Sequence, residues 1–120
     1  MKKKLVGVVV VVASALAAVS LAFAGSTTLR LAADKTKLSY NKKTLKAHAG
    51  KVTIKMTNPS AIFMHNIAIK GNGVKVKGKV VGQGKTSTVT ATLKPGVYTF
   101  YCTVPGHEAA GMKGKLIISK

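Results

Sequence analysis

The sequence predicts an all-β domain, a Greek-key β-sandwich or barrel of about seven to eight short strands. Two observations support this prediction. Apolar residues recur at every second position in short runs, as in half-buried strands, and Gly, Pro and Asn residues separate these runs. The chain of 120 residues is long enough for one small domain, and no segment shows convincing helical periodicity.

The first 24 residues are organised like a secretory signal peptide. Lysines at positions 2–4 precede an uncharged run from Leu5 to Ala24, and Ala22-Phe23-Ala24 offers a cleavage site. An uncleaved membrane anchor is the alternative, because twenty apolar or small residues can just span a bilayer. Both interpretations export residues 25–120, so we expect a periplasmic, cell-surface or extracellular domain.

The first expected strands of residues 25–120 are short. Leu29 and Leu31 indicate one strand, and Leu38 and Tyr40 indicate a second. Residues 51–57 alternate strictly and turn three apolar side chains to one face, those of Val52, Ile54 and Met56.

The second half of the chain continues in the same way. Residues 74–80, 88–93 and 116–119 are expected strands. The inward face of the middle run carries Val89, Ala91 and Leu93. Turn residues separate the strands at positions 58–60, 71–73, 82–84 and 95–96.

Three candidate metal ligands lie close together near the C-terminus. Alternation over residues 98–102 places Cys102 at the inner end of a strand. Four residues separate Cys102 from His107, and four more separate His107 from Met112. Proline and glycine at positions 105, 106 and 111 bend this loop back on itself, which brings a thiolate, an imidazole and a thioether into one small volume.

A second histidine completes the candidate site. His65 alternates with Ile67 and Ile69, so its imidazole points toward the core. Two imidazoles, one thiolate and a weaker thioether are the ligands of a blue copper site. We therefore expect a single type 1 copper ion held by His65, Cys102, His107 and Met112. The chain has no second cysteine, which excludes an intrachain disulfide and any four-cysteine metal site.

The remaining residues of these types have other expected places. His48 is expected at the surface, in a loop before a strand. Met56 shares the inward face of its strand and is expected in the core, whereas Met64 has the opposite parity to His65 and is expected to point away from the metal. Glu108, directly after His107, is expected to be exposed and inert, and a role in tuning docking or the proton of the ligand is the alternative.

Residues 98–115 strongly resemble the cupredoxins, and the plastocyanin-like small blue copper proteins in particular. The resemblance rests on the run Tyr-Thr-Phe-Tyr-Cys-Thr-Val-Pro-Gly-His followed by Gly-Met-Lys-Gly. It extends to Asn58-Pro59, to the His65-Asn66 pair and to residues 93–96, and arguably covers all of residues 25–120.

The resemblance implies the same four copper ligands and a cupredoxin-like sandwich. It also implies that Asn66 ties the His65 strand to the Cys102 loop by hydrogen bonds. The implied function is the transfer of single electrons through the exposed edge of His107, without catalysis.

The charge of the chain departs from the acidic plastocyanins. The chain carries 20 Lys and Arg against 2 Asp and Glu, and without its first 24 residues it keeps a net charge of +15. Lysine is poorly suited to reading bases, so no nucleic acid is expected. We expect a monomer and an acidic redox partner that docks near His107, where the neighbouring residues are small and apolar. Solubility and association with an anionic membrane surface are alternative uses of the charge.

Other classes of protein fit the sequence less well. A copper oxidase domain needs histidines beside the cysteine, but Tyr101 and Thr103 occupy those positions. A two-copper centre needs a second cysteine, and two distant acids give little basis for paired-carboxylate catalysis. A copper-delivery protein without electron transfer stays open, although methionine-rich or histidine-rich tracts are absent.

Overall fold

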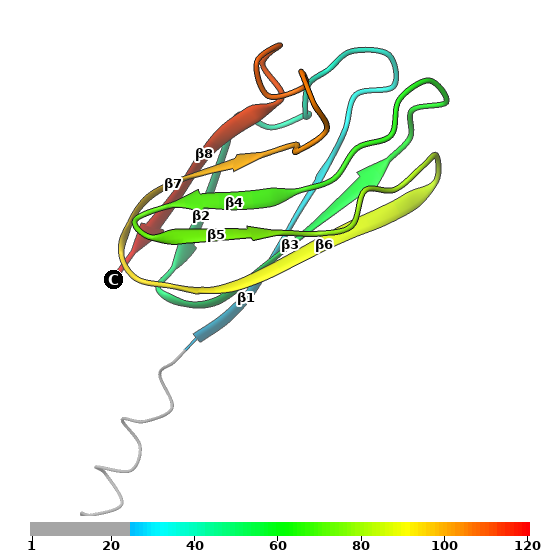
Figure 1. Cartoon of the computed structure of the whole chain (residues 1–120). Helices are drawn as coiled ribbons and strands as arrows, with labels where there is room; N and C mark the ends of the chain where they lie inside the picture. Colours follow the sequence, from blue (N-terminus) through cyan, green and yellow to red (C-terminus); the bar gives the residue numbers. More distant parts are fainter. Residues whose placement is uncertain (1–24) are drawn as a thin grey trace, which may run out of the picture.

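A computed structural model describes residues 25–120, and the predicted leader lies outside the described residues. Eight strands form two sheets that pack face to face, which confirms the all-β sandwich (Figure 1). Residues 25–120 form no α-helix, and so none that is long and apolar enough to cross a membrane.

The smaller sheet has three strands. Strand β3 (Gly50–Asn58) lies between β1 (Gly25–Ala32), with which it is parallel, and β6 (Lys85–Leu93), with which it is antiparallel. The register places Ile54 opposite Val89, so the alternating apolar residues of the two strands face the core together.

The larger sheet has five strands and carries the metal-site segments. Strand β7 lies in its centre and is antiparallel to both neighbours, whereas the edge strand β2 is parallel to β8. The strand order is β2 (Thr44–His48), β8 (Lys113–Ser119), β7 (Gly96–Tyr101), β4 (Ala68–Gly71) and β5 (Val74–Lys77).

The core lies between the sheets. Val52, Ile54 and Met56 of β3 are fully buried, as the alternation predicts. On the facing sheet, the Phe100 ring is fully buried and packs against the Tyr40 ring with 5.6 Å between centroids. The Tyr40 hydroxyl donates a hydrogen bond of 2.6 Å to the Asn66 carbonyl, so the core is tied to the segment that carries His65.

The prediction of a second strand at Leu38 and Tyr40 is wrong. Residues 38–40 form only an isolated bridge from Tyr40 to Ala33, because the Asp34 carboxylate accepts hydrogen bonds from the amides of residues 36 and 37 and fixes a turn there. The strand is β2, in a region expected to be a loop. It forms because Leu45 turns into the core and the backbone pairs with β8.

The strand predicted over residues 74–80 is shorter than expected. Strand β5 ends at Lys77, because the backbone then turns toward the site. The Gly78 amide donates to the Ile67 carbonyl at 2.9 Å, and the Gly78 carbonyl accepts from the Asn66 side-chain Nδ2 group at 3.0 Å. Val80 therefore lies beyond the strand and is 42% exposed.

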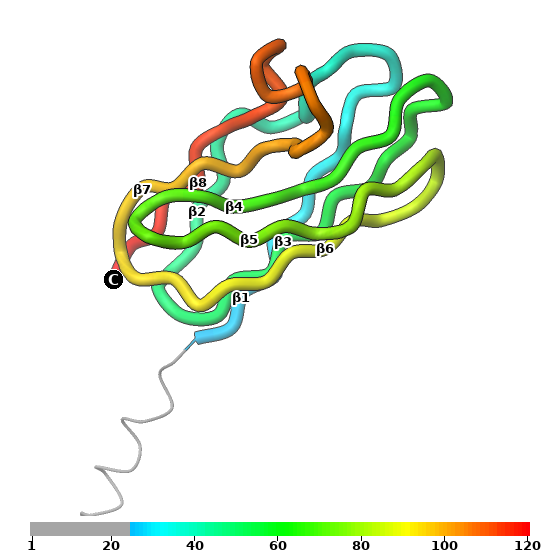
Figure 2. Tube along the Cα trace, viewed as in Figure 1, coloured from blue at the N-terminus to red at the C-terminus, as the bar shows by residue number. Residues whose placement is uncertain are grey.

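The two ends of the sandwich differ. The loop between β7 and β8 lies at one end, together with the segment before β4 (Figure 2). Strand β1 begins at the opposite end (Figures 1 and 2). The candidate ligands are therefore gathered far from the point at which the chain enters the domain.

Candidate metal centre

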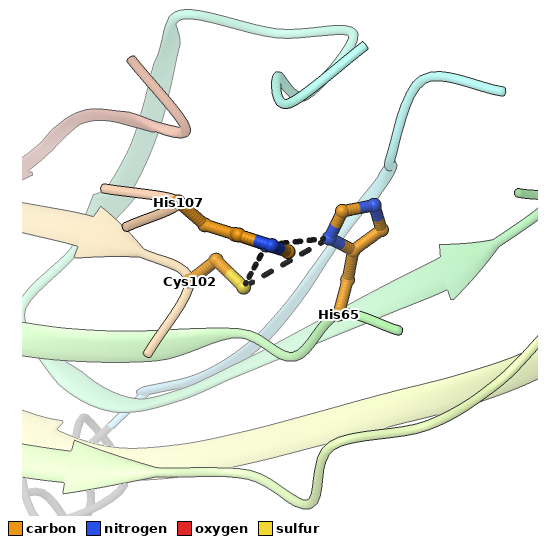
Figure 3. Close-up of side chains that lie close together, drawn as sticks. All are labelled: His65, Cys102 and His107. Atoms are coloured by element: carbon orange, nitrogen blue, oxygen red, sulfur yellow. Dashed lines mark hydrogen bonds between the residues drawn. The ribbon is translucent and has the colours of Figure 1, made fainter. Parts of the chain in front are cut away.

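Three buried donor side chains converge at the loop end of the sandwich (Figure 3). His65 lies shortly before β4, Cys102 directly follows β7, and His107 lies in the loop that leads to β8. The two imidazole Nδ1 atoms are 3.2 Å apart. The Cys102 Sγ atom lies 3.6 Å from Nδ1 of His107 and 3.9 Å from Nδ1 of His65.

The size of this triangle fits one metal ion. A first-row ion bonds nitrogen and sulfur at about 2.0–2.3 Å, so three donors in a plane around it are held roughly 3.5–4.0 Å apart. The observed separations of 3.2, 3.6 and 3.9 Å are close to this range. Two imidazoles and one thiolate in a triangle are the donor set of type 1 copper.

Burial keeps the two imidazoles of the site in a form that can bind a metal ion. The exposed fractions of His65, Cys102 and His107 are 0%, 1% and 7%. Desolvation and, to a smaller extent, the neighbouring His107 together lower the pKa of His65 to about 4. Desolvation also lowers the pKa of His107. Both imidazoles are therefore held in the neutral form that binds metals.

Packing against Phe63 fixes the orientation of the two imidazoles. The Phe63 ring lies 6.0 Å from the His65 ring and 5.8 Å from the His107 ring, in the second case edge to face. The Nε2 atom of His65 is buried without a hydrogen-bond partner among residues 25–120. Its Nδ1 atom faces the triangle, and the second ring nitrogen points away from it (Figure 3).

The loop that carries Cys102, His107 and Met112 closes on itself through its backbone. The Met112 amide donates to the His107 carbonyl at 3.0 Å, and the Cys102 amide donates to the Met112 carbonyl at 3.2 Å. Gly106 and Gly111 supply the positive φ angles of +85° and +110° that these bends need. The Met112 side chain is fully buried.

Asn66 joins the two segments of the site. Its Oδ1 atom accepts a 2.7 Å hydrogen bond from the Thr103 amide, and its Nδ2 group donates to the Thr103 hydroxyl at 2.9 Å. The same Nδ2 group donates to the Gly78 carbonyl. The residues next to His65 and Cys102 are therefore held at a fixed separation.

The other sulfur and imidazole groups lie elsewhere. Met56 is buried in the core, and Met64 is 54% exposed, which confirms both expectations. His48 is exposed as expected, but it lies in strand β2 and not in a loop. Its Nδ1 atom contacts the Lys120 carbonyl at 2.9 Å, beside the C-terminal end of β8 and away from Cys102.

Glu108 is less exposed than expected, and it forms an ion pair. Its side chain is 31% exposed, and its Oε2 atom lies 2.6 Å from the Lys70 Nζ atom. The same ammonium group lies 4.3 Å from the centre of the Tyr101 ring. The sequence holds no signal for this ion pair, because it depends on the pairing of β4 with β7.

Comparison with known proteins agrees with this donor set. The model of a family described as copper binding proteins, plastocyanin/azurin family, matches residues 27–119. The dithionite-reduced auracyanin of the photosynthetic bacterium Roseiflexus castenholzii is 30% identical, with a TM-score of 0.71. The match covers 80% of this chain and 100% of the auracyanin.

Two further solved structures have the same fold. Auracyanin A, a "blue" copper protein from the green thermophilic photosynthetic bacterium Chloroflexus aurantiacus, is 27% identical with a TM-score of 0.68, and the match covers 79% of this chain and all of that one. A reduced Cu(I) amicyanin variant is 20% identical with a TM-score of 0.56, over 77% of this chain and 82% of that one. The amicyanin supports the fold alone.

Proposed function

We propose a function from one premise: the chain belongs to the plastocyanin/azurin family of copper-binding proteins. Members of this family are generally electron carriers and not enzymes. The donor set fits a single type 1 copper ion. We infer that His65, Cys102, His107 and Met112 would hold the ion, with the Met112 thioether as the weakest of the four donors. A copper ion held there would supply one-electron chemistry between Cu(II) and Cu(I), so the protein would carry one electron at a time.

The observation that supports this proposal best is the buried, preformed triangle of two imidazoles and a thiol. A rigid donor set suits both oxidation states, because little has to move when the electron is gained or lost. Asn66 and the backbone bonds of the Cys102–Met112 loop supply this rigidity.

His107 is the route that we propose for the electron. It has the largest exposed fraction of the three donors, 7%. The exposed residues around it, Pro105, Gly106, Ala109 and Ala110, are small and carry no charge. A partner protein can therefore approach the His107 ring closely and leave again quickly. The excess of lysine supports an acidic partner.

Export is also part of the proposal. The basic and apolar organisation of residues 1–24 supports an exported domain, in the periplasm, at the cell surface or outside the cell. Mass spectrometry of the protein recovered from its native compartment tests this. A chain that begins at Gly25 agrees with cleavage, a chain that keeps residues 1–24 in the membrane fraction agrees with an anchor, and a cytoplasmic chain contradicts export.

The first test is visible absorption after addition of Cu(II), followed by a redox titration. We expect an intense band in the red region that bleaches on reduction and returns on oxidation. Bound copper without this band, or copper that cannot be reduced and reoxidised reversibly, would contradict electron transfer and would favour copper delivery.

A further inference from the structure

A basic groove lies on the outer face of the five-stranded sheet. It has a volume of about 480 Å³ and is lined by Lys43, Lys113 and Lys115, by the hydroxyl-bearing Thr44 and Thr99, and by Glu108. All three lysines are exposed. The groove thus gathers ammonium groups and hydroxyl groups, which are the donors that bind carboxylates.

The three lysines of the groove have no carboxylate partner among residues 25–120. The described part of the chain has two side-chain carboxylates, and the one ion pair found there joins Glu108 to Lys70. Asp34 instead caps the turn at residues 34–37. The like charges of Lys43, Lys113 and Lys115 therefore repel one another until an external anion enters the groove.

The floor of the groove is fixed by the backbone. The Lys115 amide donates a 2.9 Å hydrogen bond to the Lys43 carbonyl, which holds the two lysines side by side. Gly114 directly precedes Lys115, and a Cβ atom there would collide with the Lys43 carbonyl and the Phe100 ring. Ordering of the backbone therefore adds little to the cost of binding.

The groove reaches the metal end of the molecule. Glu108 lines it and directly follows His107, and Lys113 directly follows Met112. The smaller sheet also carries lysines, at Lys51 and Lys55 of β3, and these lie outside the lining of the groove. A partner held by the groove thus lies beside His107, whereas a partner on the smaller sheet does not.

We propose that this groove binds a carboxylate-rich segment of the protein redox partner and so positions that partner at His107. The inference rests on the proposed function, because it assumes that electrons leave near His107. The occupant is an acidic protein segment, because the three exposed ammonium groups of the groove complement carboxylates and the groove lies beside the loop through which a protein partner would exchange electrons.

The test measures binding of a labelled octapeptide of alternating Asp and Glu to the copper-loaded protein by fluorescence anisotropy. The groove variant is Lys43→Gln/Lys115→Gln, and the matched control is Lys51→Gln/Lys55→Gln, which removes the same net charge. Lys113 is left unchanged because it adjoins Met112. We expect the groove variant to bind the peptide at least tenfold more weakly than the parent protein. The control variant should lose less than twofold in peptide affinity. The variant Lys43→Arg/Lys115→Arg should bind nearly as well as the parent protein.

Other outcomes overturn the inference. Equal losses in the two Gln variants would mean that net charge alone attracts the peptide. Peptide binding that is unchanged in the groove variant would place the peptide at another site. If the groove lysines were needed only for binding to phosphatidylglycerol vesicles, the groove would be a membrane contact. The absorption band and reversible reduction are measured in the same samples. If the parent protein lacks the band and reversible reduction, the proposed function is contradicted. If it shows both but does not bind the peptide through the groove, only the inference about the groove is contradicted.

Discussion

At the scale of single residues, the chemistry of the site depends first on Cys102, the one cysteine of the chain. We expect Cys102→Ser to abolish the intense visible band, because a serine hydroxyl does not supply the thiolate-to-copper charge transfer. Absorption spectra of the copper-loaded variant check this. Met64→Leu is the control, since it removes an exposed sulfur atom and should leave the band unchanged. A blue Cys102→Ser protein would contradict the assignment.

Met112 has a different expected role from Cys102. Met112→Leu should keep a coloured site and raise its reduction potential, because a weak axial donor to the oxidised ion is lost. Voltammetry of the copper-loaded protein measures the potential. Met56→Leu, a buried methionine of the core, should leave the potential unchanged. If Met112→Leu were colourless, Met112 would be more than an axial ligand.

Asn66 acts through its neighbours and not on the metal directly. Asn66→Ala removes its hydrogen bonds to Thr103 and Gly78 and leaves buried groups without partners, at a cost of about 1–3 kcal/mol in the free energy of unfolding. We also expect copper affinity to fall by about 10–100-fold, as for other residues that orient ligands. Urea denaturation and copper competition titrations give the two values.

A matched control separates these two effects of Asn66. Asn41→Ala removes an exposed hydrogen bond to the Ala32 amide, so it should lower stability slightly without changing copper affinity. An Asn66→Ala protein with unchanged copper affinity would show that Asn66 only stabilises the fold.

At the scale of elements, strand β8 is constrained by the close approach of its neighbours at Gly114. Gly114→Ala places a methyl group against the Phe100 ring and the Lys43 carbonyl, so we expect a loss of about 1–3 kcal/mol or more in the free energy of unfolding. Gly82→Ala is the control, because nothing lies within 4 Å of a Cβ atom there. Thermal melting of both variants checks this, and equal melting temperatures would contradict it.

Strands could be predicted where apolar residues alternate strictly. They could not be predicted where a strand forms only because a neighbouring strand pairs with it. Residues 51–57 and 88–93 alternate strictly and lie within β3 and β6. Leu38 and Tyr40 alternate too, but the turn that the Asp34 carboxylate stabilises replaces the expected strand. Only an isolated bridge between Tyr40 and Ala33 forms there. Strand β2 has few apolar residues and exists because β8 offers a parallel partner, which no local pattern reveals.

The site was predictable to a similar degree. His65, Cys102 and His107 converge because parity and loop length place them, and both can be read from the sequence. The hydrogen bonds of Asn66 followed only from the family resemblance. The ring contacts of Phe63 and the pair Lys70–Glu108 depend on how β4 meets the ligand loop, so they had to await the structure.

At the scale of the whole molecule, the lysines create a positive field around the electron carrier. We expect the rate of reduction by hexacyanoferrate(II), an anion, to fall as ionic strength rises, because salt shortens the screening length to about 10 Å at 0.1 M. Stopped-flow absorption measures the rate. Oxidation of the reduced protein by tris(phenanthroline)cobalt(III), a cation, should instead accelerate with salt. If neither the rate of reduction nor the rate of oxidation changes with ionic strength, electrostatic steering of the reagents is contradicted.

The position of Gly25 has a practical consequence. Strand β1 begins at Gly25, at the end of the sandwich opposite the loop between β7 and β8, and its eight residues span roughly 26 Å. A linker joined ahead of Gly25 therefore attaches the protein to an electrode or bead by the end away from its ligand loop. Molecules immobilised in this way all present His107 to the solution, so reagents in solution reach it freely, whereas tunnelling to the solid support has to cross the long axis of the domain.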